Sequence, residues 1–502
     1  MISFGQKKAG SDIKSALILL VGISVASSLF YPQFSLNHDA SWYLVSTDMF
    51  LDGAELYRDI MEINPPLSFY LTVPPVTVAR WFGIDPTLSY FLYCISIGIC
   101  SSLWSLRVVS NAAISTWQRR GLFISVLIVN FVLPISEFGQ REHLMLMLAM
   151  PFVINQMLGR VCRKIGVFER IALGLAASFG FLLKPYFLLI PACIGLARLC
   201  VQRDLSVFRS PGFLSIAITT IAYLLFIFLA HPGYVERVVP LGLQVYDSYG
   251  RAPAGVLIRL ELAALVVMIS FILLSRRGYS DNSTILLLAA SVGAAASYLI
   301  QFKGWNYQIL PLSAFIVMTA AWILVTHHDL VRQNAKMAVL LPITICAGLG
   351  PQLARGPYQA ATTMAFKPFV DGKEKSILVL STNVWASFPF INEINGTWTS
   401  RYPAQWLLPG AIDRLASKGC GDGRCAKAQS IASFARSSII DDIDQFEPKV
   451  IFVDERAHKS YFASQGFDYL DFLSEDPRFA DIRSCYTRAG NAGNYGVYRK
   501  AC

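Results

Sequence analysis

A short polar stretch with one carboxylate follows the first apolar run of this chain and reads Asn-His-Asp-Ala-Ser-Trp-Tyr over residues 37–43. If that run crosses a lipid bilayer, Asp39 is held near the membrane surface, where lipid head groups lie. A carboxylate there can accept a proton from a hydroxyl group or help to bind a metal ion. The stretch can equally open a helix, with Asn37 or Asp39 as its N-cap. The residues alone leave both interpretations open.

A second group of ionisable side chains lies between two later apolar runs, where Glu137, Arg141, Glu142 and His143 fall within seven positions. Charges at such a boundary are costly unless they pair with one another or serve a site. Glu137 and Glu142 are candidates for a second catalytic carboxylate, and Arg141 and His143 for contacts to a phosphate. The alternative is an Arg–Glu ion pair that anchors a turn.

Two lysines stand at the ends of other apolar runs: Lys184 in Leu-Lys-Pro-Tyr, and Lys303 in Gln-Phe-Lys-Gly-Trp-Asn-Tyr. A single lysine at a membrane end is ordinary, because its stem lies in lipid while its ammonium group reaches water. Here, however, the candidate carboxylates and cations are all expected on one membrane face. Such a cluster suits a phosphate carried by a lipid, since cations stabilise a departing phosphate while a carboxylate activates a hydroxyl group.

The composition indicates that membrane helices position these residues. The chain has 502 residues, of which 54% are hydrophobic and 15% charged, against a usual charged fraction of about 25%. A soluble protein of this length could not bury so much apolar surface, so we predict a polytopic α-helical membrane protein. The net charge of +10 is assigned to short loops that set topology, and no nucleic-acid partner is expected.

Apolar runs predict about eleven membrane spans. The longest run, 171–199, exceeds one crossing, and a single helix there would place Lys184 near the bilayer centre at a cost of about 3 kcal/mol. Two short spans that meet at Lys184-Pro185 avoid this cost. Basic residues then concentrate in the inner loops, with the N-terminus in the cytoplasm and the C-terminus outside. The runs are 13–30, 88–106, 121–135, 144–158, 171–199, 213–229, 254–274, 284–300, 309–325 and 337–349.

The polar tail after residue 350 is expected to form a separate α/β domain outside the membrane, over residues 351–502. Its β-branched runs at 376–380 and 450–453 predict buried strands, and 411–416 and 430–435 predict helices.

Four cysteines of the tail suggest disulfides, because an exported domain lies in an oxidising compartment. The pairs Cys420–Cys425 and Cys485–Cys502 form the favoured one of three connectivities. A zinc site is the alternative, although the spacing is poor for one.

Several short motifs, in this order, resemble the GT-C superfamily of membrane glycosyltransferases. They are an acidic residue after the first span, Gly-x-x-x-Tyr-x-Asp at 53–59, Asn-Pro-Pro-Leu at 64–67 and Leu-Leu-Lys-Pro at 182–185. More narrowly, the pattern resembles the bacterial relatives of protein O-mannosyltransferases and of the lipid A aminoarabinose transferase. Those relatives usually have Lys-Pro-Pro-Leu, whereas Asn64 replaces the lysine here.

This resemblance covers the membrane part and implies a GT-C-like transmembrane domain over residues 1–350, with a helical first outer loop at 31–85. It implies an inverting enzyme of a bacterial inner membrane that takes a sugar from a polyprenyl-phosphate donor. The acceptor would be a surface glycan, a lipid or a protein on the outer, periplasmic side, where the C-terminal domain would also lie.

The resemblance also assigns roles by position. Asp39 corresponds to the presumed base, and Glu137 or Glu142 to a second acidic residue. Lys184, Arg141 and Lys303 would contact the donor phosphate, together with His143. Some relatives bind a divalent ion, so Mg²⁺, Mn²⁺ or Zn²⁺ held by Asp39 and Glu137 is possible and no cofactor is certain. The substrate-facing residues of the first outer loop would be Glu55, Tyr57, Arg58 and Asn64.

Two other functions remain alternatives, a transporter or flippase of lipid-linked saccharides and a polymerase or ligase that uses them. Transporters usually place ionisable or helix-breaking residues near the bilayer midplane. Charges expected at one membrane surface therefore favour an enzyme. The first outer loop, rich in polar and aromatic residues, argues against a polymerase or ligase, whose key basic residues typically lie in late loops.

Overall fold

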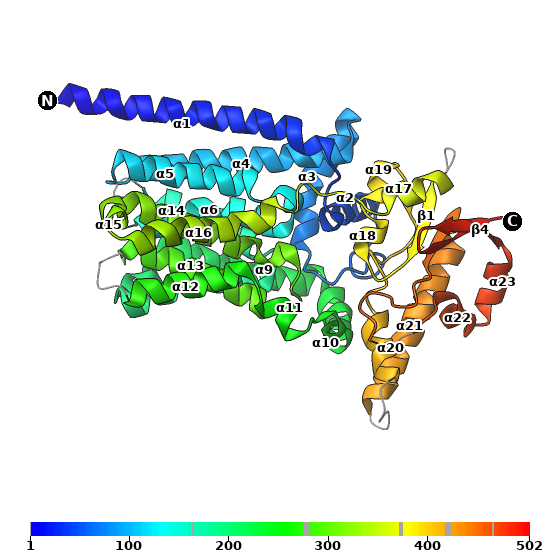
Figure 1. Ribbon diagram of the computed structural model, residues 1–502. Coiled ribbons are helices and arrows are strands. Elements are labelled where there is room, and N and C mark those ends of the chain that lie inside the picture. The colour runs from blue at the N-terminus through cyan, green and yellow to red at the C-terminus, as the bar shows by residue number, and fades with distance from the viewer. Residues whose placement is uncertain are drawn as a thin grey trace. The chain divides into compact units, whose positions relative to one another are not determined.

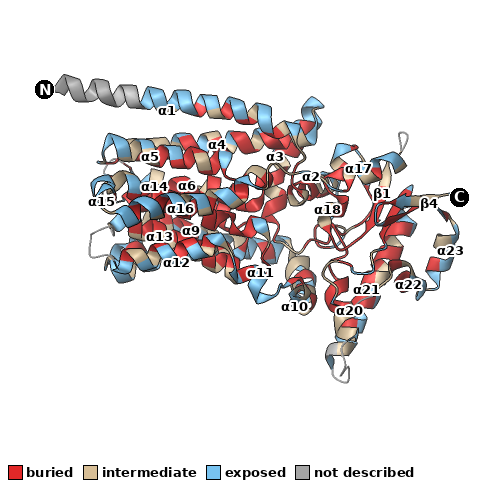
Figure 2. Cartoon of the chain, in the orientation of Figure 1, coloured by how far each residue is buried: buried red, intermediate tan, exposed pale blue. Residues whose placement is uncertain are grey.

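The computed structural model describes the backbone of residues 2–159, 161–162, 165–274, 281–370, 375–416, 423–463 and 466–502, and their side chains except those of 2–12, 330 and 424. The chain forms two compact units, which are treated separately below (Figures 1 and 2). Unit 1 comprises Met1–Phe34, Tyr90–Leu224 and Arg251–Tyr358, and unit 2 comprises Ser35–Ser89, Leu225–Gly250 and Gln359–Cys502. The domain boundary predicted at residue 350 stays a prediction.

Long helices make up unit 1, and α14 lies at their centre, where it packs against α5, α13 and α16. Nearly all residues in the first four turns of α14 are buried. The helices are α1 (Ile2–Phe30), α4 (Pro86–Ser110), α5 (Thr116–Leu127), α6 (Arg141–Leu158), α7 (Val167–Phe181), α8 (Leu189–Leu196), α9 (Pro211–Ala230), α11 (Pro253–Leu257), α12 (Leu260–Leu274), α13 (Asn282–Leu299), α14 (Leu310–Thr326), α15 (His328–Arg332) and α16 (Ala335–Leu353).

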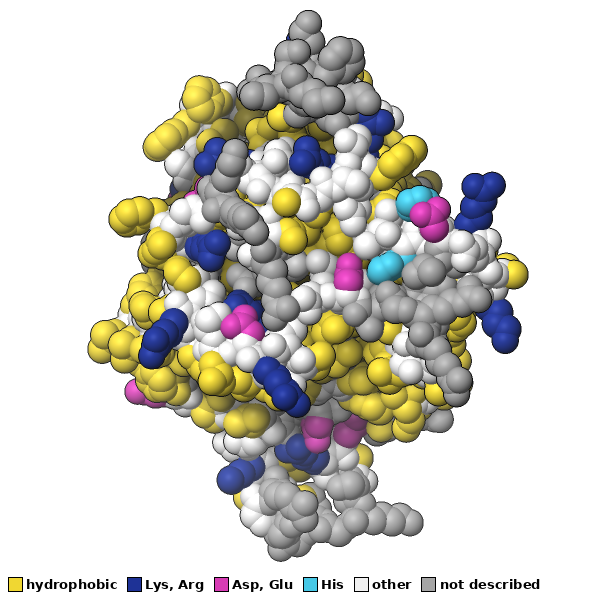
Figure 3. Space-filling view, turned by 90° about the vertical axis from the view of Figure 1, so that its left-hand side faces the viewer, with side chains coloured by type: hydrophobic (Ala, Val, Ile, Leu, Met, Phe, Trp, Pro, Cys, Tyr) yellow, Lys and Arg dark blue, Asp and Glu magenta, His cyan; other side chains and the backbone are white. Residues whose placement is uncertain are grey.

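Among the residues that the structure describes, six helical segments are long and apolar enough to cross a membrane, so the chain is a multi-pass membrane protein in its coarse architecture. Pro185–Val201 and Leu260–Leu274 are apolar but shorter. The count of eleven spans stays a prediction. Figure 3 looks onto one face of the molecule, where Lys and Arg side chains are scattered among hydrophobic ones. The six segments are Ile13–Gln33, Pro86–Ser110, Pro211–Ala230, Asn282–Leu299, Asn306–Thr326 and Ala335–Leu353.

The predicted interruption of the longest apolar run is confirmed. Helix α7 ends at Phe181, and Lys184 is extended, with φ −146° and ψ 129°. A short 3₁₀ segment, Pro185–Leu188, then leads into α8. Proline disfavours a helical conformation in the residue before it, and its own fixed φ suits the first turn of a new helix. The sequence Lys-Pro therefore separates two helices and leaves the lysine between them.

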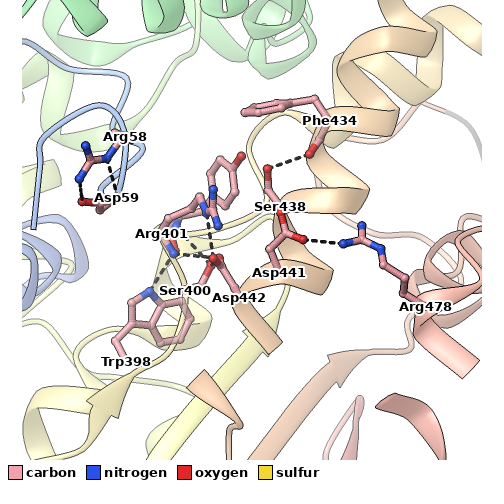
Figure 4. Close-up of polar contacts among 11 residues, drawn as sticks. Arg58, Asp59, Trp398, Ser400, Arg401, Phe434, Ser438, Asp441, Asp442 and Arg478 are labelled. Carbon is pink, nitrogen blue, oxygen red and sulfur yellow. Dashed lines mark hydrogen bonds and ion pairs between the residues drawn. The ribbon is translucent and has the colours of Figure 1, made fainter. Parts of the chain in front are cut away.

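In unit 2, the segment predicted as the first outer loop is hydrogen-bonded to the tail. The backbone N–H of Met61 donates to the carbonyl of Arg401 at 2.7 Å, and the indole of Trp406 donates to the carbonyl of Met61 at 3.1 Å. Figure 4 shows the adjoining polar contacts, in which Arg401 pairs with the buried Asp442 at 2.8 Å. The loop and its tail partner thus form one packed body. Its helices outside the tail are α2 (His38–Leu51), α3 (Leu67–Phe82) and α10 (Val239–Val245).

The tail contains a five-stranded sheet in the order β2-β1-β3-β5-β4. Strands β2 (Thr397–Trp398), β1 (Ser376–Leu380) and β3 (Val450–Asp454) are parallel, whereas β5 (Tyr495–Lys500) and β4 (Tyr486–Ala492) are antiparallel. The two strands predicted from β-branched runs are confirmed as β1 and β3. The predicted helices lie within α20 (Leu408–Ala416) and α21 (Gly423–Phe446), and two short helices follow, α22 (Tyr469–Ser474) and α23 (Arg478–Ser484).

A disulfide joins Cys485 and Cys502, whose Cα atoms are 5.2 Å apart. This predicted pair is confirmed, and it links the residue before β4 to the residues after β5, so it closes the open ends of an antiparallel hairpin. Cys425 is also disulfide-bonded, while its predicted partner Cys420 lies outside the described residues.

Candidate active site

Residues 137–140 form a tight turn that leads into α6, and the ionisable residues 141–143 lie in the first turn of that helix. The side-chain oxygen of Gln140 accepts from the backbone N–H of Arg141 at the helix start. Gly139 has φ +80°, and a Cβ atom there would meet the ring of Tyr90 at 2.7 Å. Only glycine fits this position without a shift of its neighbour. The turn thereby fixes Arg141 and Glu142 in the first turn of α6.

Glu142 and Lys184 form a buried ion pair in unit 1. Lys184 Nζ donates to Glu142 Oε1 at 2.6 Å, and the two side chains are 3% and 0% exposed. The ammonium group also lies 4.6 Å from the ring centroid of Tyr307, a cation–π contact. Removing two charges from water is expensive, and an ion pair repays this only in part. A pair this deeply buried is therefore a candidate for a functional role as well as a structural one.

Lys303 belongs to the same electrostatic environment. Its Nζ lies 4.8 Å from the ring of Trp305. Burial lowers the pKa of Lys303 to about 6, and the positive charges of Lys184 and Arg141 act in the same direction. The three cations predicted as phosphate contacts are thus close enough to influence one another. An anion bound among them would stabilise all three charged forms.

We expect Lys303→Met to flatten the pH dependence of stability between about pH 7 and 9. In that range the folded protein holds Lys303 mostly uncharged, whereas the unfolded chain keeps it protonated up to about 10.5. The unfolded state then binds the extra proton, so stability rises with pH by about 1.4 kcal/mol per unit. Unfolding free energies of wild type and variant across this range measure the difference.

Lys336→Met is the matched control, because Lys336 is an exposed lysine at the start of α16. That variant should keep the wild-type slope. Equal slopes in all three proteins would contradict a depressed pKa at Lys303.

Three charged residues near this region were not predicted from the sequence: Arg259, Glu261 and Arg355. Arg259 Nε lies 3.8 Å from a carboxylate oxygen of the buried Glu261. Burial lowers the pKa of Arg355, and the negative charges of Glu137 and Glu261 oppose that shift. Glu137 is thus surrounded by more charge than its own turn supplies. The available signal was the pair Arg-x-Glu inside the apolar run 254–274, where charges are costly.

His143 makes contacts of a different kind from those predicted for a phosphate ligand. Its Nδ1 accepts from the backbone N–H of Gly139 at 3.1 Å, and its Nε2 lies 3.0 Å from the carbonyl oxygen of Asn130. Both ring nitrogens are therefore satisfied by backbone, and the ring is fully buried beside Phe138. We assign His143 to holding the turn and leave it out of the donor site.

In unit 2, Asp39 lies in the first turn of α2. The side chain of Asn37 caps this helix by accepting the backbone N–H of Asp39 at 3.1 Å, so the capping interpretation holds for Asn37. The carboxylate of Asp39 is not consumed by that cap and lies 3.5 Å from Nε2 of His38. A negative charge in the first turn of a helix is stabilised by the helix dipole. The position of Asp39 is therefore compatible with the proposed role of a base.

The predicted substrate loop divides into a buried and an exposed part. Tyr57 is buried with φ +70°, a conformation that is strained for a tyrosine, and its hydroxyl donates to the carbonyl of Asn64. The buried carboxylate of Glu62, which was not predicted as a site residue, accepts from the Trp42 indole at 2.8 Å and from Asn64. This segment is therefore held rigidly. By contrast, Glu55 and Arg58 form an exposed ion pair.

The possible metal ligands fall in different units, Asp39 in unit 2 and Glu137 in unit 1. In the part of the chain that the structure describes, no three His, Cys, Asp or Glu side chains gather as a metal site would need. We assign no step to a metal ion.

A comparison of the chain with known protein families and with curated proteins finds no match.

Proposed function

We propose that the chain is an inverting glycosyltransferase that moves a sugar from a polyprenyl-phosphate donor to an acceptor outside the cytoplasm. The supporting observation is the set of cations in unit 1, Lys184, Lys303 and Arg141, with the buried Glu142 among them. These residues lie at the ends of apolar helices, where a phosphate on a lipid tail is presented. Cations in a low-dielectric site bind such a phosphate strongly.

In the proposed reaction, the acceptor hydroxyl oxygen attacks the anomeric carbon on the side opposite the phosphate. The new carbon–oxygen bond forms while the bond to the phosphate oxygen breaks, and polyprenyl phosphate leaves with the electron pair. Lys184 and Arg141 stabilise the charge that develops on the leaving phosphate, and Lys303 adds to this once the bound anion has raised its pKa and restored its positive charge. The resemblance to the GT-C superfamily assigns the removal of the proton from the acceptor hydroxyl group to Asp39 of unit 2. Attack from the opposite side inverts the anomeric configuration.

The charge distribution favours an enzyme over a transporter. The six apolar segments contain no Asp or Glu, and their Lys and Arg residues, Lys14, Arg107 and Lys336, lie within a turn of a segment end. A transporter of charged lipid-linked sugars usually needs polar groups near the midplane. Within these six segments, the ionisable groups lie at the ends instead.

The test uses the full chain in lipid nanodiscs with a polyprenyl-phosphate donor that carries a labelled sugar, and a deproteinised cell-envelope extract as acceptor. We expect label to pass to the extract while polyprenyl phosphate is released. Lys303→Met should lower the transfer rate at least tenfold, and Lys336→Met should leave it unchanged.

Two outcomes would contradict this function. Transfer only from a polyprenyl-diphosphate donor would indicate a polymerase or ligase. An uncleaved donor that crosses the bilayer of sealed vesicles containing the chain would indicate a carrier.

A further inference from the structure

A polar cavity of about 550 Å³ lies in unit 1 at the C-terminal end of α6. It lies at the opposite end of α6 from Arg141 and Glu142, so it is separate from the site described above. The ends of α6 and η5 (Ala197–Val201) and the beginnings of α7, α9 and α13 contribute to its walls, together with the short segment η6 (Leu205–Arg209). We propose that this cavity binds the phosphate group of an anionic membrane lipid.

Arginines dominate the charge of the cavity. Arg170, Arg198 and Arg209 line it together with Asp204 and Asp281. Arg198 is already paired, because its guanidinium donates to Asp204 at 2.6 Å. Asp281 is the N-cap of α13 and accepts the backbone N–H of Thr284. The charges of Arg170 and Arg209 are thus left to bind a ligand.

Neither of these two arginines has an ion pair among the residues that the structure describes. The Nε atom of Arg170 is buried and lacks a hydrogen-bond acceptor in the same part of the chain. A guanidinium group buried without an acceptor is unfavourable, and phosphate oxygens match its planar arrangement of donors. The cavity therefore has a net positive charge and a donor that needs an anionic acceptor.

A neutral donor completes the site. Asn155 lines the cavity and is only 5% exposed, yet its side-chain nitrogen has no acceptor within the described ranges. Pro211 at the beginning of α9 also lines the cavity, so the positive end of that helix dipole lies beside it. Together these groups can donate several hydrogen bonds to one phosphate.

The surroundings of the cavity favour a lipid as the source of this phosphate. Segment η6 contributes Ser206 and Arg209 to the cavity, while its apolar residues Leu205 and Phe208 are 71% and 65% exposed. Exposed apolar side chains beside basic ones are typical of a segment at the boundary between lipid tails and head groups. Basic cavities between membrane helices are known to bind acidic head groups.

The test measures the thermal unfolding of the full chain in nanodiscs of phosphatidylcholine, with and without phosphatidylglycerol, and counts retained lipids by native mass spectrometry. We expect phosphatidylglycerol to stabilise the wild type and to remain bound. The double variant Arg170→Gln/Arg209→Gln should bind it at least about tenfold more weakly. Asn155→Leu is a second test variant, which keeps all the arginines and remains informative even where the double variant does not fold. It should also weaken the binding of phosphatidylglycerol.

The matched control is Arg332→Gln/Lys336→Gln, which removes two exposed cations from α15 and α16 that do not line the cavity. This control should bind phosphatidylglycerol like the wild type. Equal losses in both double variants would overturn the proposal in favour of general surface charge. Stabilisation by inorganic phosphate alone, as large as that by phosphatidylglycerol, would overturn the lipid source. No effect of either probe on the wild type would overturn the site altogether.

Discussion

Lys184→Met should lower the free energy of unfolding by about 3–5 kcal/mol, because it leaves the carboxylate of Glu142 buried without its cation. The two side chains are almost fully buried and 2.6 Å apart. The other oxygen of Glu142 has no hydrogen-bond donor in the described chain, so no second group can take over from the lysine. Denaturant unfolding in detergent micelles measures this loss.

The double variant Glu142→Gln/Lys184→Met should recover much of that stability, because no uncompensated charge remains in it. The recovery measures the coupling between the two residues in a double-mutant cycle. Transfer of the labelled sugar should nevertheless stay lost in the double variant, since it lacks the contact that we propose between Lys184 and the donor phosphate. The double variant would then regain stability without regaining sugar transfer. If the ion pair were purely structural, transfer would recover together with stability.

Arg107→Met is the control for burial. Arg107 pairs with Glu169 at 2.7 Å, but its side chain is largely exposed. An exposed pair contributes little to stability, because water screens its charges. If Lys184→Met cost no more than Arg107→Met, the pair with Glu142 would have to be accessible to water.

The Lys184 region shows how far the sequence determines the site. The cost of a buried lysine and the helix-breaking effect of proline were enough to predict that Lys184 lies between two helices. The sequence does not show which carboxylate pairs with Lys184, because Glu137 and Glu142 are close together in the chain. The residue at which α6 begins decides which of the two carboxylates reaches the lysine. The structure selects Glu142.

Other parts of the site and the fold gave weaker signals. The sequence places Glu62 in a polar loop and gives no sign that it is buried. In the structure its carboxylate accepts from the indole of Trp42, a contact between residues twenty positions apart. In the tail, β1 and β3 are continuous β-branched runs, whereas β4 is mostly polar and carries an irregularity between Arg488 and Gly490. Strands of this second kind are defined by their pairing rather than by their composition.

Asp39→Asn is expected to lower sugar transfer by about 10²–10⁴-fold, the usual contribution of a general base. An amide has nearly the shape of the carboxylate but cannot accept the proton of the acceptor hydroxyl group. Stability should change little, because Asn37 still caps α2 and the loss of one charge from the first helical turn costs about 0.3–1 kcal/mol. Transfer rates at saturating donor, together with the unfolding free energy, measure both effects.

Asp52→Asn is the matched control, since Asp52 is the C-cap of the same helix and forms an exposed ion pair with Arg80 at 2.9 Å. It makes the same chemical change within the same element, and transfer should stay at the wild-type rate. If Asp39→Asn also kept that rate while the Lys184 variants lost transfer, another base would have to serve the reaction and the donor site of unit 1 would stand alone. Glu62 would be tested next, because it is a buried carboxylate of the same unit.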